Sequence, residues 1–214
     1  MDQHVDIGRI IKSEACIEEG IAALSAKHPQ FAHSFSQTGV PPTRLRPDGF
    51  AAVLSAIMSQ QVSVASARAI WGRLEDAGYD KAHTVAHATE EELRSCGLSR
   101  QKIKYAHALA HADIDFDALR NQPTAQVVAT LVKVKGIGAW TAEIYAMFSL
   151  GRADVFAPGD LALQEGARIL FDLPERPNEK TLRQMAQAWS PWRSVAARTL
   201  WAYYHVVKSR EGIA

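Results

Sequence analysis

The chain has 214 residues, of which 47% are hydrophobic and 22% are charged, the balance of an ordinary soluble globular protein. It contains no apolar run of about 18 residues, which excludes a membrane span, and its polar N-terminus lacks the pattern of a secretion signal, so a cytoplasmic protein of the bacterial-type cytosol or nucleoid is expected. The formal net charge is only +1, so any affinity for nucleic acid must come from local groups of basic residues.

Apolar residues recur at helical spacing along the chain, and no stretch alternates with a period of two between turn residues. This pattern predicts an all-α fold with about ten helices. The predicted helices lie, in chain order, at residues 13–27, 50–60, 64–77, 90–96, 99–110, 124–134, 139–150, 161–171, 179–189 and 191–208. Pro29 is expected to end the first helix, and the proline-rich segment 39–47 to form a loop. The side chains expected to cap helix starts are Asp48, Ser63, Thr89 with Glu92, Asn178 and Ser190.

A turn with two glycines joins the helices predicted at 124–134 and 139–150. Gly136 and Gly138 have no Cβ, so the backbone can turn tightly here and a partner can approach it closely. The free N–H groups at the start of the following helix favour a phosphate, and Lys133 and Lys135 add positive charge beside them. A plain hairpin of two helices is the simpler explanation of such a turn when it is taken alone.

Three short motifs occur together in this chain: SQQVS at residues 59–63, GIGAWTA at 136–142 and PGD at 158–160. In this combination the sequence resembles the helix-hairpin-helix (HhH-GPD) DNA glycosylase superfamily, with the greatest similarity to 3-methyladenine DNA glycosylase II, from about residue 50 to residue 201. The resemblance implies two helical subdomains that flank a DNA-binding cleft. One would be built from residues 1–45 and 141–214, and the other from residues 46–140, which run into the helix-hairpin-helix at 124–150.

Two aspartates are candidates for the catalytic carboxylate. Asp160 follows Pro158 and Gly159 at the predicted start of a helix, where a plain N-cap is the commonest reason for an aspartate. The resemblance implies instead that Asp160 is the catalytic residue, because the superfamily's aspartate lies at this position. A carboxylate there would stabilise the positive charge of an oxocarbenium-like transition state or help to activate water. Asp154 is the second candidate.

The resemblance also gives roles to aromatic and amide side chains. Superfamily members that nick the DNA strand carry a lysine where this chain has Trp140, so no amine is available there for a Schiff base and a monofunctional enzyme is expected. Trp140 and Trp201 would line the base pocket, where an aromatic face attracts cationic alkylated purines. From spacing alone, Trp140 is equally well explained as a core residue. Gln61, with Gln60, would be the wedge that fills the gap left by a flipped base, although both would otherwise read as solvated residues at a helix end.

The phosphate-binding residues implied by the hairpin are Lys135, Gly136, Gly138 and Thr141. No cofactor is expected, since two cysteines, Cys16 and Cys96, are too few for an iron–sulfur cluster. No metal site made of side chains is expected either, because the histidine pairs 83/87 and 107/111 have no acidic or cysteine partner. The family does imply a monovalent cation at the hairpin, on the carbonyls of Val132, Val134 and Ile137. The candidate basic patches are Arg100, Lys102 and Lys104, then Lys133 and Lys135, then Arg193 and Arg198.

The resemblance therefore implies a monofunctional DNA glycosylase of base excision repair. Its substrate would be an alkylated purine, of the 3-methyladenine or 7-methylguanine type, flipped out of double-stranded DNA. The expected protein is a monomer with no membrane partner. Two alternatives stay open: a DNA-binding module that only grips phosphates, and a glycosylase for mispaired, deaminated or oxidised bases.

Overall fold

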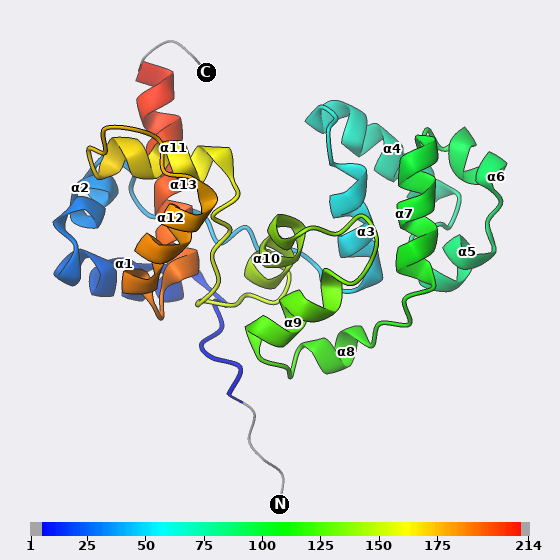
Figure 1. Cartoon of the computed structure of the whole chain (residues 1–214), viewed down its shortest axis with the longest axis horizontal. Coiled ribbons are helices and arrows are strands. Elements are labelled where there is room, and N and C mark those ends of the chain that lie inside the picture. Colours follow the sequence, from blue (N-terminus) through cyan, green and yellow to red (C-terminus); the bar gives the residue numbers. More distant parts are fainter. Residues whose placement is uncertain (1–5, 211–214) are drawn as a thin grey trace, which may run out of the picture. The chain divides into compact units, whose positions relative to one another are not determined.

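The computed structural model describes residues 6–210, and Figure 1 follows its helices from α1 in blue to α13 in red. Those residues form thirteen α-helices and one 3₁₀-helix, with no β-strand beyond a single bridge between Ile10 and Arg152. The expected all-α fold is confirmed. The ends of the chain assigned to the first predicted subdomain, residues 1–5 and 211–214, lie outside the described residues.

The count of about ten helices was too low because three helices were missed. The first helix does end before Pro29, as predicted, but Pro29 then begins a new helix, α2 (Pro29–Thr38), where the fixed φ of proline suits the first position. The other two, α5 (Ala82–His87) and α8 (Phe116–Leu119), are too short to show a helical period in the sequence.

Residues 46–145 form one compact unit of the chain. Its core lies between the buried faces of α3 and α7, where Leu54 and Ile57 of α3 and Ile103 and Leu109 of α7 are at most 2% exposed. The unit contains α3 (Phe50–Met58), α4 (Val64–Asp76), α5, α6 (Glu90–Ser95), α7 (Arg100–Ala110), α8, α9 (Thr124–Leu131) and most of α10 (Ala139–Phe148).

The second compact unit joins residues 6–45 to the chain after residue 145. Its core holds a cluster of aromatic rings around Trp189, which stacks on Phe171 at 5.7 Å between centroids and meets Phe31 and Phe156 edge-on. Such pairs add to the stabilisation that burial provides. The unit contains α1 (Glu14–Lys27), α2, α11 (Leu161–Leu170), α12 (Glu179–Met185), the 3₁₀-helix Ala186–Trp189 and α13 (Arg193–Arg210).

Most of the predicted caps are confirmed. The Thr89 and Glu92 pair forms a reciprocal capping box, and the side chains of Ser63 and Asn178 each accept a hydrogen bond from the third residue after them. Asp48 is not a cap, because its carboxylate pairs with Arg120 and Gly49 takes the N-cap position of α3.

Ser190 does not cap the last helix. The helix begins at Arg193, and the Ser190 hydroxyl donates a hydrogen bond to the Asp154 carboxylate instead. No helix among residues 6–210 is long and apolar enough to cross a membrane.

Candidate DNA-binding hairpin and base pocket

The hairpin turn follows α9, which ends at Leu131 and not at Val134 as predicted. Gly136 has a φ of +96° in this turn, and a Cβ there would collide with the Tyr105 ring of α7. Gly138 differs, because it lies at the surface and a Cβ on it would meet no atom within 4 Å. Gly136 is thus needed by the fold itself, whereas nothing among the described residues requires a glycine at position 138.

Gln60, which belongs to the same unit, holds the hairpin through two hydrogen bonds. Its side-chain amide donates hydrogen bonds to the Gly136 carbonyl (3.2 Å) and to the Thr141 hydroxyl (3.4 Å). Thr141 is only 4% exposed, so its hydroxyl is not presented to a phosphate. Gln61, in the turn between α3 and α4, is exposed and has a φ of +56°. Of the two glutamines, Gln61 is the exposed one, whereas Gln60 is engaged by the hairpin.

The exposed basic residues near the hairpin are fewer than the sequence suggested. Lys133 and Lys135 lie at the surface, as do Arg100 and Lys104 on α7. Lys102 instead donates a hydrogen bond to the carbonyl of Met58 (2.6 Å), and burial lowers the pKa of its ammonium group. Of the predicted basic patches in this unit, the exposed members are therefore Lys133 and Lys135 on the turn and Arg100 and Lys104 on α7.

Asp160 lies at the N-cap of α11 in the other unit. Its Oδ1 atom accepts hydrogen bonds from the backbone N–H groups of Ala162 (2.9 Å) and Leu163 (3.1 Å). The same oxygen accepts a third hydrogen bond, 3.1 Å long, from the indole Nε1 of Trp201 on α13. The carboxylate is half-buried and held in one orientation. Asp160 is therefore an N-cap, as its local sequence suggests, and it also contacts the predicted pocket residue Trp201.

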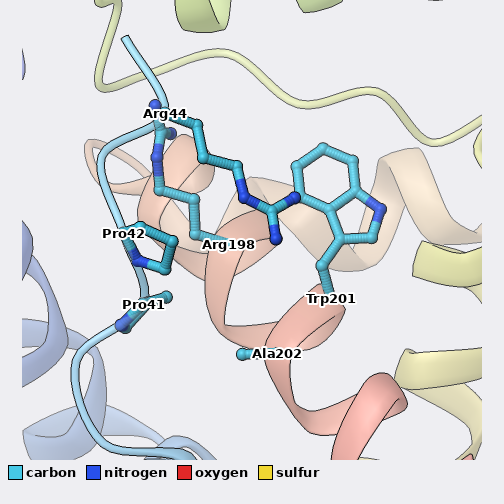
Figure 2. A pocket seen from close by; sticks show the side chains of 6 residues that line it. All are labelled: Pro41, Pro42, Arg44, Arg198, Trp201 and Ala202. Carbon is cyan, nitrogen blue, oxygen red and sulfur yellow. The ribbon is translucent and has the colours of Figure 1, made fainter. Parts of the chain in front are cut away.

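Trp201 forms part of a pocket in the same unit. Its indole stacks on Phe148 with centroids 5.8 Å apart and an interplanar angle of 29°. Figure 2 shows the pocket beside this ring and the Arg44 side chain that extends toward the indole. The lining residues are Pro41, Pro42, Arg44, Arg198, Trp201 and Ala202.

Arg198 supports the pocket from below the surface. It is 2% exposed, and its guanidinium donates hydrogen bonds to the carbonyls of Thr43, Ser194 and Met147. Burial, together with the charge of Arg44, lowers the pKa of Arg198 to about 10, which still leaves it protonated at neutral pH. The prediction that Arg198 forms part of a basic surface patch was wrong.

Asp154, the second catalytic candidate, is occupied in an ion pair. Arg193 donates two hydrogen bonds to its carboxylate, at 2.6 and 3.0 Å, and Ser190 donates a third at 2.8 Å. Burial alone would raise the pKa of the Asp154 carboxyl, but the bonds from Arg193 and Ser190 outweigh it and hold that pKa below its ordinary value. Arg193 is therefore paired with a carboxylate, although one third of its side chain remains exposed.

The remaining sequence candidates lie as follows. Trp140, in the first turn of α10, is 41% exposed, so it is not a core residue. No group of three His, Cys, Asp or Glu side chains in the described part of the chain could hold a metal ion. Val134 belongs to the turn, where its carbonyl accepts a hydrogen bond from the N–H of Ile137 at 3.0 Å.

Neither Arg44 nor the pocket role of Arg198 was predicted from the sequence. Arg44 lies in a loop expected to be a mere linker, and Arg198 looked like one of many arginines on a helix surface. The only signal was the position of Arg198 three residues before Trp201, which places both near one face of a helix.

Comparisons with known proteins agree with this geometry. Residues 54–191 match the model of the HhH-GPD superfamily base excision DNA repair proteins. The chain is 30% identical over 161 residues to DNA-3-methyladenine glycosylase 1 of Schizosaccharomyces pombe, a match that covers 70% of this chain and 69% of the relative. Asp160 lies within the matched range of the family model, whereas Arg44, Arg198 and Trp201 lie outside it.

Two solved structures show the same fold. One is a DNA-3-methyladenine glycosidase of Bacillus halodurans, with a TM-score of 0.81 and 31% identity over 94% of this chain and 95% of that one. The other is the S. pombe 3-methyladenine DNA glycosylase in complex with abasic DNA, with a TM-score of 0.75 and 26% identity over 86% and 95%. These findings confirm the resemblance stated from the motifs and support an alkyl-base glycosylase of base excision repair. The chain belongs to the HhH-GPD superfamily of base excision DNA repair proteins.

Proposed function

We propose that this protein is a monofunctional DNA glycosylase that hydrolyses the N-glycosidic bond of alkylated purines flipped out of duplex DNA. The observation that carries this proposal is the hydrogen bond between the Asp160 carboxylate and the Trp201 indole, next to a surface pocket. It places a fixed negative charge beside an aromatic ring, which is the pair of groups that cleavage of a cationic nucleotide needs.

In the proposed reaction the bond between C1′ of the sugar and the purine nitrogen breaks. The electron pair leaves with the base, so a cationic 7-methylguanine departs as a neutral molecule and the sugar becomes positively charged. Asp160 stabilises that charge, and a water molecule then adds its oxygen to C1′ and loses a proton. Because Trp140 offers no amine at the hairpin, no Schiff base forms there, and the product is an abasic site in an intact strand.

Within the base pocket, Trp201 would attract the positive charge of an alkylated purine through its aromatic face, by about 0.5 to 2 kcal/mol. Trp140 would also contact the base. N-alkylated purines are favoured because their glycosidic bonds are already weak, so the pocket need not read one particular shape.

The hairpin would anchor the DNA backbone. We assign the phosphate contact to the N–H groups around Gly138 and to Lys135, with Gly136 shaping the turn and Thr141 holding Gln60 in place. A monovalent cation could bind the carbonyls of Val132, Val134 and Ile137, and Gln61 would fill the space left by the flipped base. The protein would act as a monomer where the chromosome lies.

The exposed apolar side chains support this assignment. Large apolar residues at the surface of a soluble protein often mark a binding site when they gather near polar groups of interest. Among the described residues, six large apolar side chains are exposed. Five of these six lie in the hairpin or directly after Arg44, Gln61 or Asp160 in the sequence. The five are Leu45, Val62, Val132, Trp140 and Leu161, and the sixth is Phe35.

Incubation with methylated duplex DNA tests the proposal. We expect free 3-methyladenine and 7-methylguanine in the soluble fraction, abasic sites in the DNA, and no strand nicks or borohydride-trapped complex. A module that only grips phosphates would bind methylated and intact duplex equally and release no base. A panel of duplexes with uracil, hypoxanthine and 8-oxoguanine would reveal a glycosylase for other lesions.

A further inference from the structure

Arg44 is an unpaired cation at the mouth of the Trp201 pocket. Its side chain is exposed and makes no hydrogen bond or ion pair with any described residue. In Figure 2 it extends from the 41–44 loop toward the Trp201 indole, and both residues line the same pocket. An exposed arginine more often extends into solvent or pairs with a carboxylate, so this placement needs a cause.

The backbone of the 41–44 loop explains the position of the Arg44 side chain. Arg44 itself has a φ of +51°, a left-handed conformation that is uncommon for residues other than glycine. The carbonyl of the residue before it, Thr43, accepts two hydrogen bonds from the buried guanidinium of Arg198, at 3.2 and 3.0 Å. Because Arg198 precedes Trp201 by less than one helical turn, the clamp ties the loop to the part of α13 that carries the pocket ring.

We propose that Arg44 is a specificity-determining residue of the base pocket, which disfavours cationic bases relative to neutral ones. The inference rests on the proposed function and deepens it. Because Arg44 lines the same pocket as Trp201, its guanidinium repels a cationic purine that enters the pocket by its like charge. A neutral base with a carbonyl oxygen or ring nitrogen at its edge would instead accept a charge-assisted hydrogen bond from Arg44.

A phosphate contact is the other use that an exposed arginine beside a DNA-binding site can have. The two uses differ in what they predict. A phosphate contact lowers the affinity for every duplex by the same factor when it is removed, and it reduces the salt dependence of binding. A contact to the base changes the ratio of affinities between lesions.

The test measures the Kd of two duplexes that differ only in the charge of the lesion. One carries 7-methylguanine and the other hypoxanthine, both as 2′-fluoro nucleotides whose glycosidic bonds resist cleavage. Kd is measured for the wild-type protein, for Arg44→Gln and for Arg176→Gln, which removes an exposed arginine of the same unit far from the pocket in sequence. Base release from the cleavable versions is measured in parallel.

We expect Arg44→Gln to change the ratio of the two Kd values by about two- to fivefold in favour of the cationic lesion, the range of one partly exposed charge interaction. Arg176→Gln should leave the ratio unchanged. An unchanged ratio in Arg44→Gln would overturn the inference, whether both Kd values stay the same or rise together. If the wild-type protein releases no base, the proposed glycosylase activity fails, while the Kd ratio still decides the role of Arg44.

Discussion

The hairpin turn and the Trp201 pocket differ in how far apart in the sequence their residues lie. In the hairpin, Lys135, Gly136 and Gly138 belong to one short segment, and the groups offered to a partner are mainly backbone N–H groups. At the pocket, three separate segments supply Trp201, the loop of residues 41–44 and Asp160, which accepts a hydrogen bond from Trp201, and the groups offered are side chains. The proposed contact to the DNA backbone is therefore encoded locally, whereas the proposed chemistry and its selectivity depend on tertiary packing.

The largest effect is expected at Asp160, whose carboxylate accepts a hydrogen bond from the pocket residue Trp201. Asp160→Asn should reduce base release by about 100-fold or more, because a preorganised negative charge is lost where positive charge develops. Asparagine is as good an N-cap as aspartate, so the fold should persist. Single-turnover release of 7-methylguanine, with circular dichroism as a check on folding, measures both.

Asp154→Asn is the matched control for that experiment. It removes a carboxylate that is already bound to Arg193 and Ser190, so we expect a loss of stability with little change in the rate. If Asp160→Asn retained the wild-type rate, or if Asp154→Asn lost it, the assignment of the catalytic residue would be wrong.

The next largest effect is expected at Arg198, whose buried guanidinium holds the pocket loop by hydrogen bonds. Arg198→Met keeps the length of the side chain but removes every donor, and it leaves the carbonyls of Thr43, Ser194 and Met147 without their partner. We expect the free energy of unfolding to fall by about 2–4 kcal/mol. Urea denaturation measures this fall. Arg176→Met, on the surface, should change it by less than about 0.5 kcal/mol, and equal values for the two variants would contradict the role of Arg198.

Alanine substitutions of the two hairpin glycines should have different effects, Gly136→Ala on stability and Gly138→Ala on DNA binding. Gly136→Ala is expected to lower the free energy of unfolding by about 2 kcal/mol or more, because a Cβ would collide with Tyr105 in a left-handed conformation. Gly138→Ala has open space and should change it by less than about 1 kcal/mol.

Gly138→Ala should nevertheless weaken binding to duplex DNA by about tenfold, since the added methyl group keeps a phosphate away from the N–H groups of the turn. Thermal unfolding and fluorescence anisotropy with a labelled duplex measure the two quantities. Normal DNA binding by Gly138→Ala would remove the hairpin from the proposed interface.

The smallest expected effect is on the stability of the protein at acidic pH. The pKa of Asp154 is lower in the folded protein than its ordinary value of 3.8, so its ion pair contributes stability that is present above that value and is lost as the pH falls through the folded pKa. Between pH 5 and pH 3 the wild-type protein should therefore lose more stability than Asp154→Asn, by up to about 1 kcal/mol for a partly exposed pair. Urea denaturation at several pH values measures the difference, and parallel curves for the two proteins would show that this pair contributes nothing.

The sequence by itself determined the helical class, the family and most helix starts. These depend on neighbours within about four residues, as in the Thr89–Glu92 capping box, or on a contiguous motif such as GIGAWTA. It failed at Ser190 and Asp48, which were expected to cap helices, because their side chains bind Asp154 and Arg120 from distant segments. A local pattern carries no information about such partners.

Only the tertiary structure decided which charges remain available for function. In the sequence, Arg44, Arg193 and Arg198 are three equivalent arginines. In the fold, Arg193 is bound to a carboxylate and Arg198 is buried against carbonyls, whereas Arg44 remains unpaired beside Trp201. The physical reason is that the cost of burying a charge, and the donors or acceptors that offset it, are set by packing between distant segments and not by the residue type.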